Sequence, residues 1–314
     1  MKHAKQCFSG IGGQAVLEGV MMKCKDQYAV AVRKESKEIE TKVEEYKGIF
    51  GSSVIKKVPF IRGVFQFVDS MVLGMKALTY STSFYEEEQE PSKFERFISK
   101  ILGDKAESVI MGFTMILSFA LAIGIFMVLP YGISSLFRNV IDSTILLGVV
   151  EGFVRIGIFV GYVSLISLMK DIHRLYQYHG AEHKCINCIE SGLDLTVENV
   201  MKSSKEHKRC GTSFMLIVMV ISIFVFFFIT VSNPVYRVLL RIALLPVIAG
   251  ISYEIIRLAG RSNHVLVRLI SKPGMWLQHL TTKEPDASMV EVAIASVEAV
   301  FDWKEYLKQE FQRD

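Results

Sequence analysis

This sequence carries little net charge. Its 314 residues include 36 lysines and arginines and 32 aspartates and glutamates, which gives a formal net charge of +4. A balance so close to neutral gives no reason to expect nucleic-acid binding. The sequence also lacks a P-loop, because no Lys-Ser or Lys-Thr pair follows Gly12-Gly13 at the required spacing. Its first 15 residues lack the apolar run of a signal peptide, so none is expected.

Hydrophobic residues make up 51% of the chain and charged residues 22%. The mean hydropathy of +0.34 is higher than soluble proteins usually reach, while the charged fraction is too high for a protein buried entirely in lipid. The composition therefore argues against a cytosolic enzyme, a disordered chain and a disulfide-stapled secreted domain. It predicts a membrane part and an aqueous part in one chain.

Four apolar stretches predict an α-helical polytopic membrane protein with about four spans, because about 20 apolar residues cross the hydrocarbon core as a helix. The stretches are 109–129, 145–169, 212–232 and 238–259. The second contains Glu151 and Arg155, which lie four residues apart and can neutralise each other on one helix face. The fourth contains Arg241, Glu254 and Pro246, a predicted kink.

The basic residues predict the orientation of these spans. Residues 1–108 hold 17 lysines and arginines, residues 170–211 hold 7, and residues 257–314 hold 8. The connection between the first two spans holds only Arg138, and the one between the last two is a short turn around Asn233-Pro234. Both termini and the central loop, 170–211, are therefore predicted to face the cytoplasm.

Outside the spans, the pattern predicts three cytoplasmic pieces. Residues 1–58 form a small β-rich unit, since 28–34 and 38–47 alternate as paired strands do. Residues 59–108 hold an amphipathic helix, which lies at the membrane surface or packs on the bundle, and a charged linker around 86–91. Residues 260–314 follow the membrane domain, 109–259, as a helical tail with an amphipathic helix from Pro285-Asp286.

The five cysteines all fall in predicted cytoplasmic segments. They are Cys7, Cys24, Cys185, Cys188 and Cys210. An odd number in a reducing compartment indicates free thiols or metal ligands rather than disulfides. Cys185 and Cys188 lack the partner pair of a zinc ribbon.

The central loop holds the residues best suited to chemistry. If it is helical, His179 and His183 lie one turn apart on the same face, with Glu182 beside them. Two imidazoles at this spacing can hold one metal ion, with the carboxylate as a ligand or general base, and His-x-x-Glu-His is also the spacing of the inverzincin metallopeptidases. His207 and Cys210 are possible further ligands. The alternative is that the histidines only form hydrogen bonds, and Gly180 would weaken a helix here by roughly 1 kcal/mol relative to alanine.

Four other polar residues are candidate site members. Glu254 lies inside a predicted span, where ionisable groups often mark a functional site, although a salt-bridged stripe with Arg257 and Arg261 is an equally good explanation. If Glu254 is functional, it could face the His179–His183 region. The remaining candidates are Glu190, Glu18 and Gln14.

Five segments resemble the YqhQ-like family of bacterial integral membrane proteins. They are GGQAVLEGVMM (12–22), YHGAEHK (178–184), HKRCGTSF (207–214), PVIAGISYEIIRLAGR (246–261) and PGMWLQHLTTKEPD (273–286). The family pattern has a proline where Lys208 stands and does not include Cys185 and Cys188. The resemblance implies a multi-pass protein of the bacterial inner membrane and, through the family's usual description, a metal-dependent enzyme.

These observations favour a metal-dependent membrane hydrolase with its site at the cytoplasmic membrane surface. A divalent transition metal such as zinc is the expected cofactor. Two alternatives remain open at this point: a non-enzymatic scaffold, chaperone or assembly factor for other membrane proteins, and a small transporter that uses Glu254. The expected partners are the lipid bilayer and either membrane proteins or further copies of this chain.

Overall fold

The computed structural model of this chain describes residues 7–49, 51, 58–85, 93–103, 106–229, 231, 233–261 and 264–312. The chain forms two compact units. Unit 1 consists of Met1–Tyr85, Tyr162–Ile221 and Leu244–Asp314, and unit 2 consists of Glu86–Gly161 and Ser222–Ala243. The predicted linker at 86–91 lies outside the described residues.

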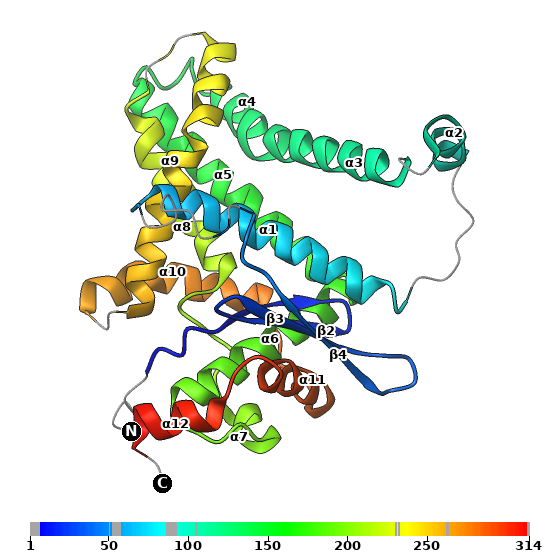
Figure 1. The fold of residues 1–314 in the computed structure, drawn as a ribbon. Helices are drawn as coiled ribbons and strands as arrows, with labels where there is room; N and C mark the ends of the chain where they lie inside the picture. The colour runs from blue at the N-terminus through cyan, green and yellow to red at the C-terminus, as the bar shows by residue number, and fades with distance from the viewer. Residues whose placement is uncertain are drawn as a thin grey trace. The chain divides into compact units, whose positions relative to one another are not determined.

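Unit 1 begins with an antiparallel sheet whose strands follow one another in the order β1-β2-β3-β4 (Figure 1). The strands are β1 (Gly12–Val16), β2 (Gly19–Cys24), β3 (Gln27–Arg33) and β4 (Ile39–Glu45). The predicted strand pair corresponds to β3 and β4, and Gly12-Gly13 begins β1. Pairing of Val16 with Gly19 leaves a two-residue turn in which Glu18 has a φ of 51°. The sequence-based prediction of a β-rich N-terminus is therefore confirmed.

Helices make up most of the rest of the chain. Those of unit 1 are α1 (Ile61–Thr82), α6 (Lys170–Glu190), α7 (Val197–Lys202), α10 (Val265–Thr281), α11 (Ala287–Glu298) and α12 (Trp303–Phe311). Unit 2 contains α2 (Lys93–Leu102), α3 (Ala106–Ile123), the π-helical segment η3 (Gly124–Val128) and α4 (Leu129–Ser135). Residues of both units occur in α5 (Thr144–Ile166), α8 (Gly211–Phe227) and α9 (Pro234–Arg261).

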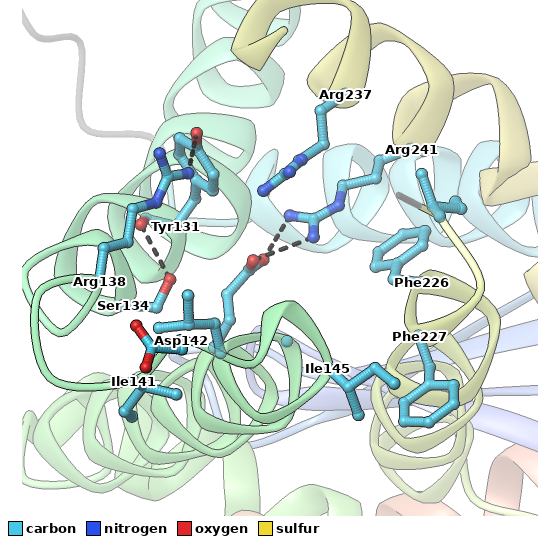
Figure 2. Close-up of a pocket in the computed structure, with 14 residues that line it drawn as sticks. Tyr131, Ser134, Arg138, Ile141, Asp142, Ile145, Phe226, Phe227, Arg237 and Arg241 are labelled. Atoms are coloured by element: carbon cyan, nitrogen blue, oxygen red, sulfur yellow. Dashed lines mark hydrogen bonds and ion pairs between the residues drawn. The ribbon is translucent and has the colours of Figure 1, made fainter. Parts of the chain in front are cut away.

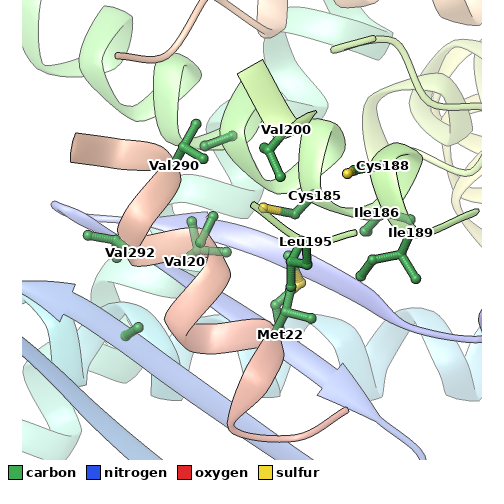
Figure 3. Packing of buried hydrophobic residues seen from close by; sticks show 14 of the residues in the cluster. Val20, Met22, Cys185, Ile186, Cys188, Ile189, Leu195, Val200, Val290 and Val292 are labelled. Atoms are coloured by element: carbon green, nitrogen blue, oxygen red, sulfur yellow. The ribbon is translucent and has the colours of Figure 1, made fainter. Parts of the chain in front are cut away.

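Strands β2 and β3 are buried on both faces, and because side chains alternate across a strand, each face joins a different cluster. Val20 and Met22 of β2 join a cluster with α6, α7 and α11 (Figure 3). Met21, between them, joins a second cluster that includes Leu73 and Ala77 of α1. The helix α11 begins where the sequence predicts it, because the Asp286 side chain accepts a hydrogen bond of 2.9 Å from the Met289 N–H. The sheet is thus a middle layer that fixes α6 on one side.

The buried side of α1 is the side that faces the sheet. The helix buries Leu73, Ala77 and Ser81, while the large apolar residues Met71 and Met75 are 49% and 39% exposed. The reason is close packing: a β-carbon added at Gly74 would lie 2.2 Å from the Gln14 side-chain oxygen. Small side chains therefore face the sheet, and the large apolar ones are left outside.

Among the residues that the structure describes, three helices are long and apolar enough to cross a membrane, judged by length and composition. They are Gly112–Ser135, Ile145–Ile166 and Val235–Ala259. The third predicted span, 212–232, is helical only as α8, which has 17 residues. The N–H groups of Phe228 and Ile229 donate to carbonyls three residues back, a tightening typical of the last turn of a helix.

Candidate metal centre

The His-x-x-Glu-His sequence lies on α6, a helix distinct from α5. Met169 separates the two helices with an extended backbone (φ −70°, ψ 134°). Gly180 does not interrupt α6, and its role lies in packing: a β-carbon there would lie 2.0 Å from the carbonyl oxygen of Lys283. The Lys283 N–H also donates to the Tyr176 carbonyl at 2.9 Å. Glycine is thus the residue that lets the segment after α10 lie against α6.

The two histidines of α6 present the same ring nitrogen to one point. His179 Nδ1 lies 2.8 Å from the Thr281 carbonyl oxygen, and His183 Nδ1 lies 2.7 Å from that of Lys205. A carbonyl only accepts, so both Nδ1 atoms carry the proton. In the neutral form of each ring Nε2 then carries the lone pair, which is the arrangement found in histidines that bind metals.

Cys210 completes the cluster from the end of the loop that precedes α8. Its Sγ lies 3.3 Å from His179 Nε2 and 3.1 Å from Thr212 Oγ1. The ligand atoms of His179, His183 and Cys210 all lie within 4.8 Å of one another. His183 is 1% exposed, so the three donors meet in a nearly dry place. We call His179, His183 and Cys210 the donor triad.

The Cys210 thiol and the His179 imidazole of the donor triad shift each other's pKa values. Burial by itself opposes ionisation of the Cys210 thiol, but the charges and hydrogen bonds of His179 and His183 hold the pKa of that thiol well below its usual value. Burial likewise opposes protonation of His179, but the neighbouring Cys210 raises the pKa of His179 to about 9. These shifts favour a thiolate at Cys210 and an imidazolium at His179, and a metal ion that binds there would displace the proton from His179 Nε2.

Glu182 lies at the edge of the donor triad. Its Oε2 is 3.9 Å from His179 Nε2 and 3.8 Å from His183 Nε2, and the residue is 4% exposed. Strand β1 covers it, because a β-carbon added at Gly13 would lie 2.9 Å from Glu182 Cγ. Gly13 thus allows the sheet to approach the carboxylate closely, and Glu182 is positioned to act near the triad.

His207 is close to the donor triad without belonging to it. Its ring centroid is 5.5 Å from that of His183, and its Nε2 lies 3.7 Å from Glu190 Oε2 and 3.3 Å from an Arg209 nitrogen. Burial lowers the pKa of His207 below its usual value. The backbone of His207 is held at both N–H and C=O by the buried Gln278 side chain. His207 therefore supports the chain beside the triad.

Glu190 joins a separate cluster at the end of α6. Its Oε1 accepts hydrogen bonds from the Ser9 N–H at 2.9 Å and the Ser9 hydroxyl at 2.7 Å, and Arg209 donates to the same oxygen. Burial opposes ionisation of Glu190, but the bond to His207 and the charge of Arg209 lower its pKa to about 2. This carboxylate ties the N-terminal segment to the loop that carries Cys210.

We expect Glu190→Gln to lower the free energy of unfolding by about 3 kcal/mol at pH 7, because the folded protein stabilises the ionised Glu190 carboxylate relative to the unfolded chain. A lowered pKa stabilises the fold above the ordinary value of 4.5, and this contribution is lost as the pH falls towards 2. Denaturant unfolding in detergent at several pH values should therefore show that wild type and Glu190→Gln differ less in free energy of unfolding below pH 4.5. Glu198→Gln, in an exposed ion pair on α7, is the control and should leave the unfolding midpoint unchanged. An equal effect of Glu190→Gln at all pH values would contradict the assignment.

The other three candidates lie in separate contacts. Glu18 accepts hydrogen bonds from Arg174 and from the Tyr178 hydroxyl. Gln14 donates to the Ser70 carbonyl on α1 at 3.2 Å. Glu254 pairs with Arg62, whose Nε donates at 2.6 Å, so its partner comes from α1 and not from the predicted stripe on its own helix.

Sequence reasoning missed residues that orient the donor triad, two through backbone carbonyls and Gln278 through its side chain. The carbonyls of Thr281 and Lys205 fix the two histidines, and Gln278 holds the intervening chain. A backbone acceptor leaves no mark on residue type, so the only signal was the resemblance of 273–286 to the family pattern.

The chain has relatives among known proteins. A family described as "Protein of unknown function (DUF1385)" matches residues 58–303. "Uncharacterized protein YqhQ" of Bacillus subtilis (strain 168) is 35% identical over 288 residues, which cover 91% of this chain and 90% of that protein. No solved structure matches the chain. The chain therefore belongs to the DUF1385 family, and its similarity to YqhQ confirms the YqhQ-like resemblance of the five quoted segments.

Proposed function

We propose that this chain is a multi-pass protein of the bacterial inner membrane with four spans and cytoplasmic termini. Three helices have the length and composition of spans, and α8, with 17 residues, is at the short end of the range that can cross. The asymmetry of the basic residues supports the orientation, since 32 of 36 lie in 1–108, 170–211 and 257–314. The exposed apolar side chains of α1, such as Met71 and Met75, fit a helix at the inner membrane surface.

The function that the geometry supports best is metal-dependent hydrolysis at the cytoplasmic membrane surface. One observation carries this proposal: two imidazole Nε2 atoms and a thiol converge, and the Nδ1 of each imidazole faces a backbone carbonyl, so that Nε2 is the atom available to a metal. Nitrogen and sulfur donors of this kind suit zinc, and three protein ligands are typical of catalytic sites.

The donor triad would hold the metal, and Glu182 would act beside it. A zinc ion bound there would supply a Lewis acid that activates water near neutral pH. Glu182 is buried and within 4 Å of both Nε2 atoms, so it is suited to accept a proton as a general base. His179 is the most exposed of these imidazoles, with 15% of its side chain accessible, so the approach to the site is from its side.

The first test is the metal content of purified full-length protein. We expect about one zinc per chain, and loss of that zinc in His183→Ala. The matched control is His173→Ala, which removes an exposed histidine from the same helix and should retain the metal. Wild-type protein with no stoichiometric transition metal would rule out the proposal.

The second test separates catalysis from a purely structural metal. In zinc-loaded Glu182→Gln, we expect zinc to stay bound and hydrolysis of 4-nitrophenyl acetate to fall by about 100-fold or more, the usual contribution of a general base. Loss of zinc from this variant would make Glu182 a ligand instead. A zinc-loaded wild type that is no faster than Glu182→Gln would favour the scaffold alternative.

A further inference from the structure

Four arginines lie outside the three predicted cytoplasmic segments, 1–108, 170–211 and 257–314. They are Arg138, Arg155, Arg237 and Arg241. All four lie in unit 2, although they come from different parts of the sequence. Three of them line one cavity of about 370 Å³, and the fourth, Arg155, binds a glutamate in its wall (Figure 2). The basic residues outside the cytoplasmic segments thus converge on one place.

The wall of this cavity contains a buried ion network. Glu151 accepts hydrogen bonds from Arg155 at 2.8 Å and from Arg241 Nη2 at 2.9 Å. Arg155 also donates to the Phe126 carbonyl at 2.9 Å. The three charged residues of the network are 3% to 6% exposed. Removing one member of such a network leaves a buried charge uncompensated.

The charges of this buried ion network do not sum to zero. One glutamate is shared by two arginines, which leaves one positive charge in a place with little water. Within the described part of the chain, Arg241 Nε has no hydrogen-bond partner, and a buried donor without an acceptor is costly. Asp142 at the cavity adds one negative charge, but Arg138 and Arg237 add two positive ones. The four arginines therefore face two carboxylates.

Arg237 brings a further cation to the same cavity. Its guanidinium extends toward the space between Tyr131 and Arg241 in Figure 2. Its Nε donates to the Val231 carbonyl at 2.8 Å, and its charge lies 5.3 Å from the centre of the Tyr131 ring. Among the described residues it has no carboxylate partner. A second cation is thus held beside an already positive network.

We propose that this cavity binds a phosphate-type oxyanion, with Arg237 and Arg241 as its principal contacts. The volume is within the range of small-ligand sites. A guanidinium presents its N–H groups in a planar fork that matches phosphate oxygens, and Ser134 and Tyr131 place hydroxyl groups in the same lining. Under the proposed topology the cavity faces the outer side, where a lipid headgroup and a dissolved phosphate both carry this chemistry.

The test uses full-length protein purified in detergent and three variants. Inorganic phosphate is titrated calorimetrically, and retention of phosphatidylglycerol or phosphatidylcholine is counted by native mass spectrometry. We expect Arg237→Gln to weaken binding by about tenfold or more, as loss of a charge-assisted hydrogen bond does. Arg237→Lys keeps the charge but not the fork, so it should weaken binding less. Lys304→Gln removes an exposed charge on α12 and should have no effect.

The outcomes distinguish the source of the anion. Binding of phosphatidylglycerol alone identifies a lipid site, and binding of inorganic phosphate alone identifies a site for a dissolved anion; either supports the proposal if Arg237→Gln weakens it. Should Arg237→Gln fail to fold, Arg237→Lys carries the comparison. The proposal is overturned if none of the probes binds, or if binding is the same in wild type and the Arg237 variants. Zinc content is measured on the same samples and is expected to be unchanged, so this result is independent of the donor triad.

Discussion

Serine in place of Cys210 should lower the zinc affinity of the full-length protein by about 100-fold or more. The Cys210 thiol is held ionised beside His179 and His183, and a thiolate is one of the strongest protein ligands for zinc, whereas a serine hydroxyl stays protonated at neutral pH. Mutating a residue that merely orients a ligand already costs 10- to 100-fold. Competition against a chromophoric chelator measures the change.

The control for this variant is Cys24→Ser, which changes a half-buried cysteine of β2 outside the donor triad and should leave the affinity as in wild type. Zinc should also raise the unfolding temperature of wild type and of Cys24→Ser, because a ligand that binds only the folded state stabilises it. If zinc stabilised Cys210→Ser equally, the thiol would have no part in binding the metal.

Gly180→Ala is expected to destabilise the protein by about 3 kcal/mol and to weaken zinc binding at the same time. The new β-carbon would lie 2.0 Å from the Lys283 carbonyl oxygen, and backbone cannot yield as a flexible side chain does. Overpacking of this kind costs about 1–3 kcal/mol or more. The displaced segment includes Thr281, whose carbonyl holds His179, so the zinc affinity should fall by about 10-fold. Unfolding in detergent and chelator competition measure the two effects.

Gly157→Ala is the matched control, because a β-carbon at Gly157 in α5 meets nothing within 4 Å. Alanine favours a helix over glycine by up to about 1 kcal/mol, so this variant should be neutral or slightly more stable. If Gly180→Ala behaved in the same way, the close approach of the 281–285 segment to α6 would not matter to the site.

The part of the site that depends on helical spacing could be predicted from the sequence. His179 and His183 lie one turn apart wherever 179–183 is helical, and Glu182 must then be their neighbour. Cys210 is 27 residues from His183, so its place beside them depends on how the chain returns after α7. The sequence placed Cys210 only as a possible further ligand, with His207, at the end of the central loop.

The rest of the arrangement depends on packing between distant segments. Glu254 has basic residues three and seven positions later in its own helix, yet it binds Arg62 because α1 packs against α9. For α1, the sequence pattern left open whether the apolar face lies at the membrane surface or packs on the bundle. Apolar periodicity identifies the more hydrophobic side of a helix, whereas the side that approaches the sheet here is the one with small residues.

The two-sided burial of the N-terminal sheet has a consequence for the order of synthesis. The strands pair through short connections and can form as soon as they emerge. One face, with Val20 and Met22, is completed by α11, whose residues 287–298 come at the end of the chain. At a ribosomal rate of about 5–20 residues per second, that face waits roughly 10 to 50 seconds while the intervening helices are made. That face of the sheet can therefore be completed only by the C-terminal segment, after the apolar helices α3, α5, α8 and α9 have been synthesised.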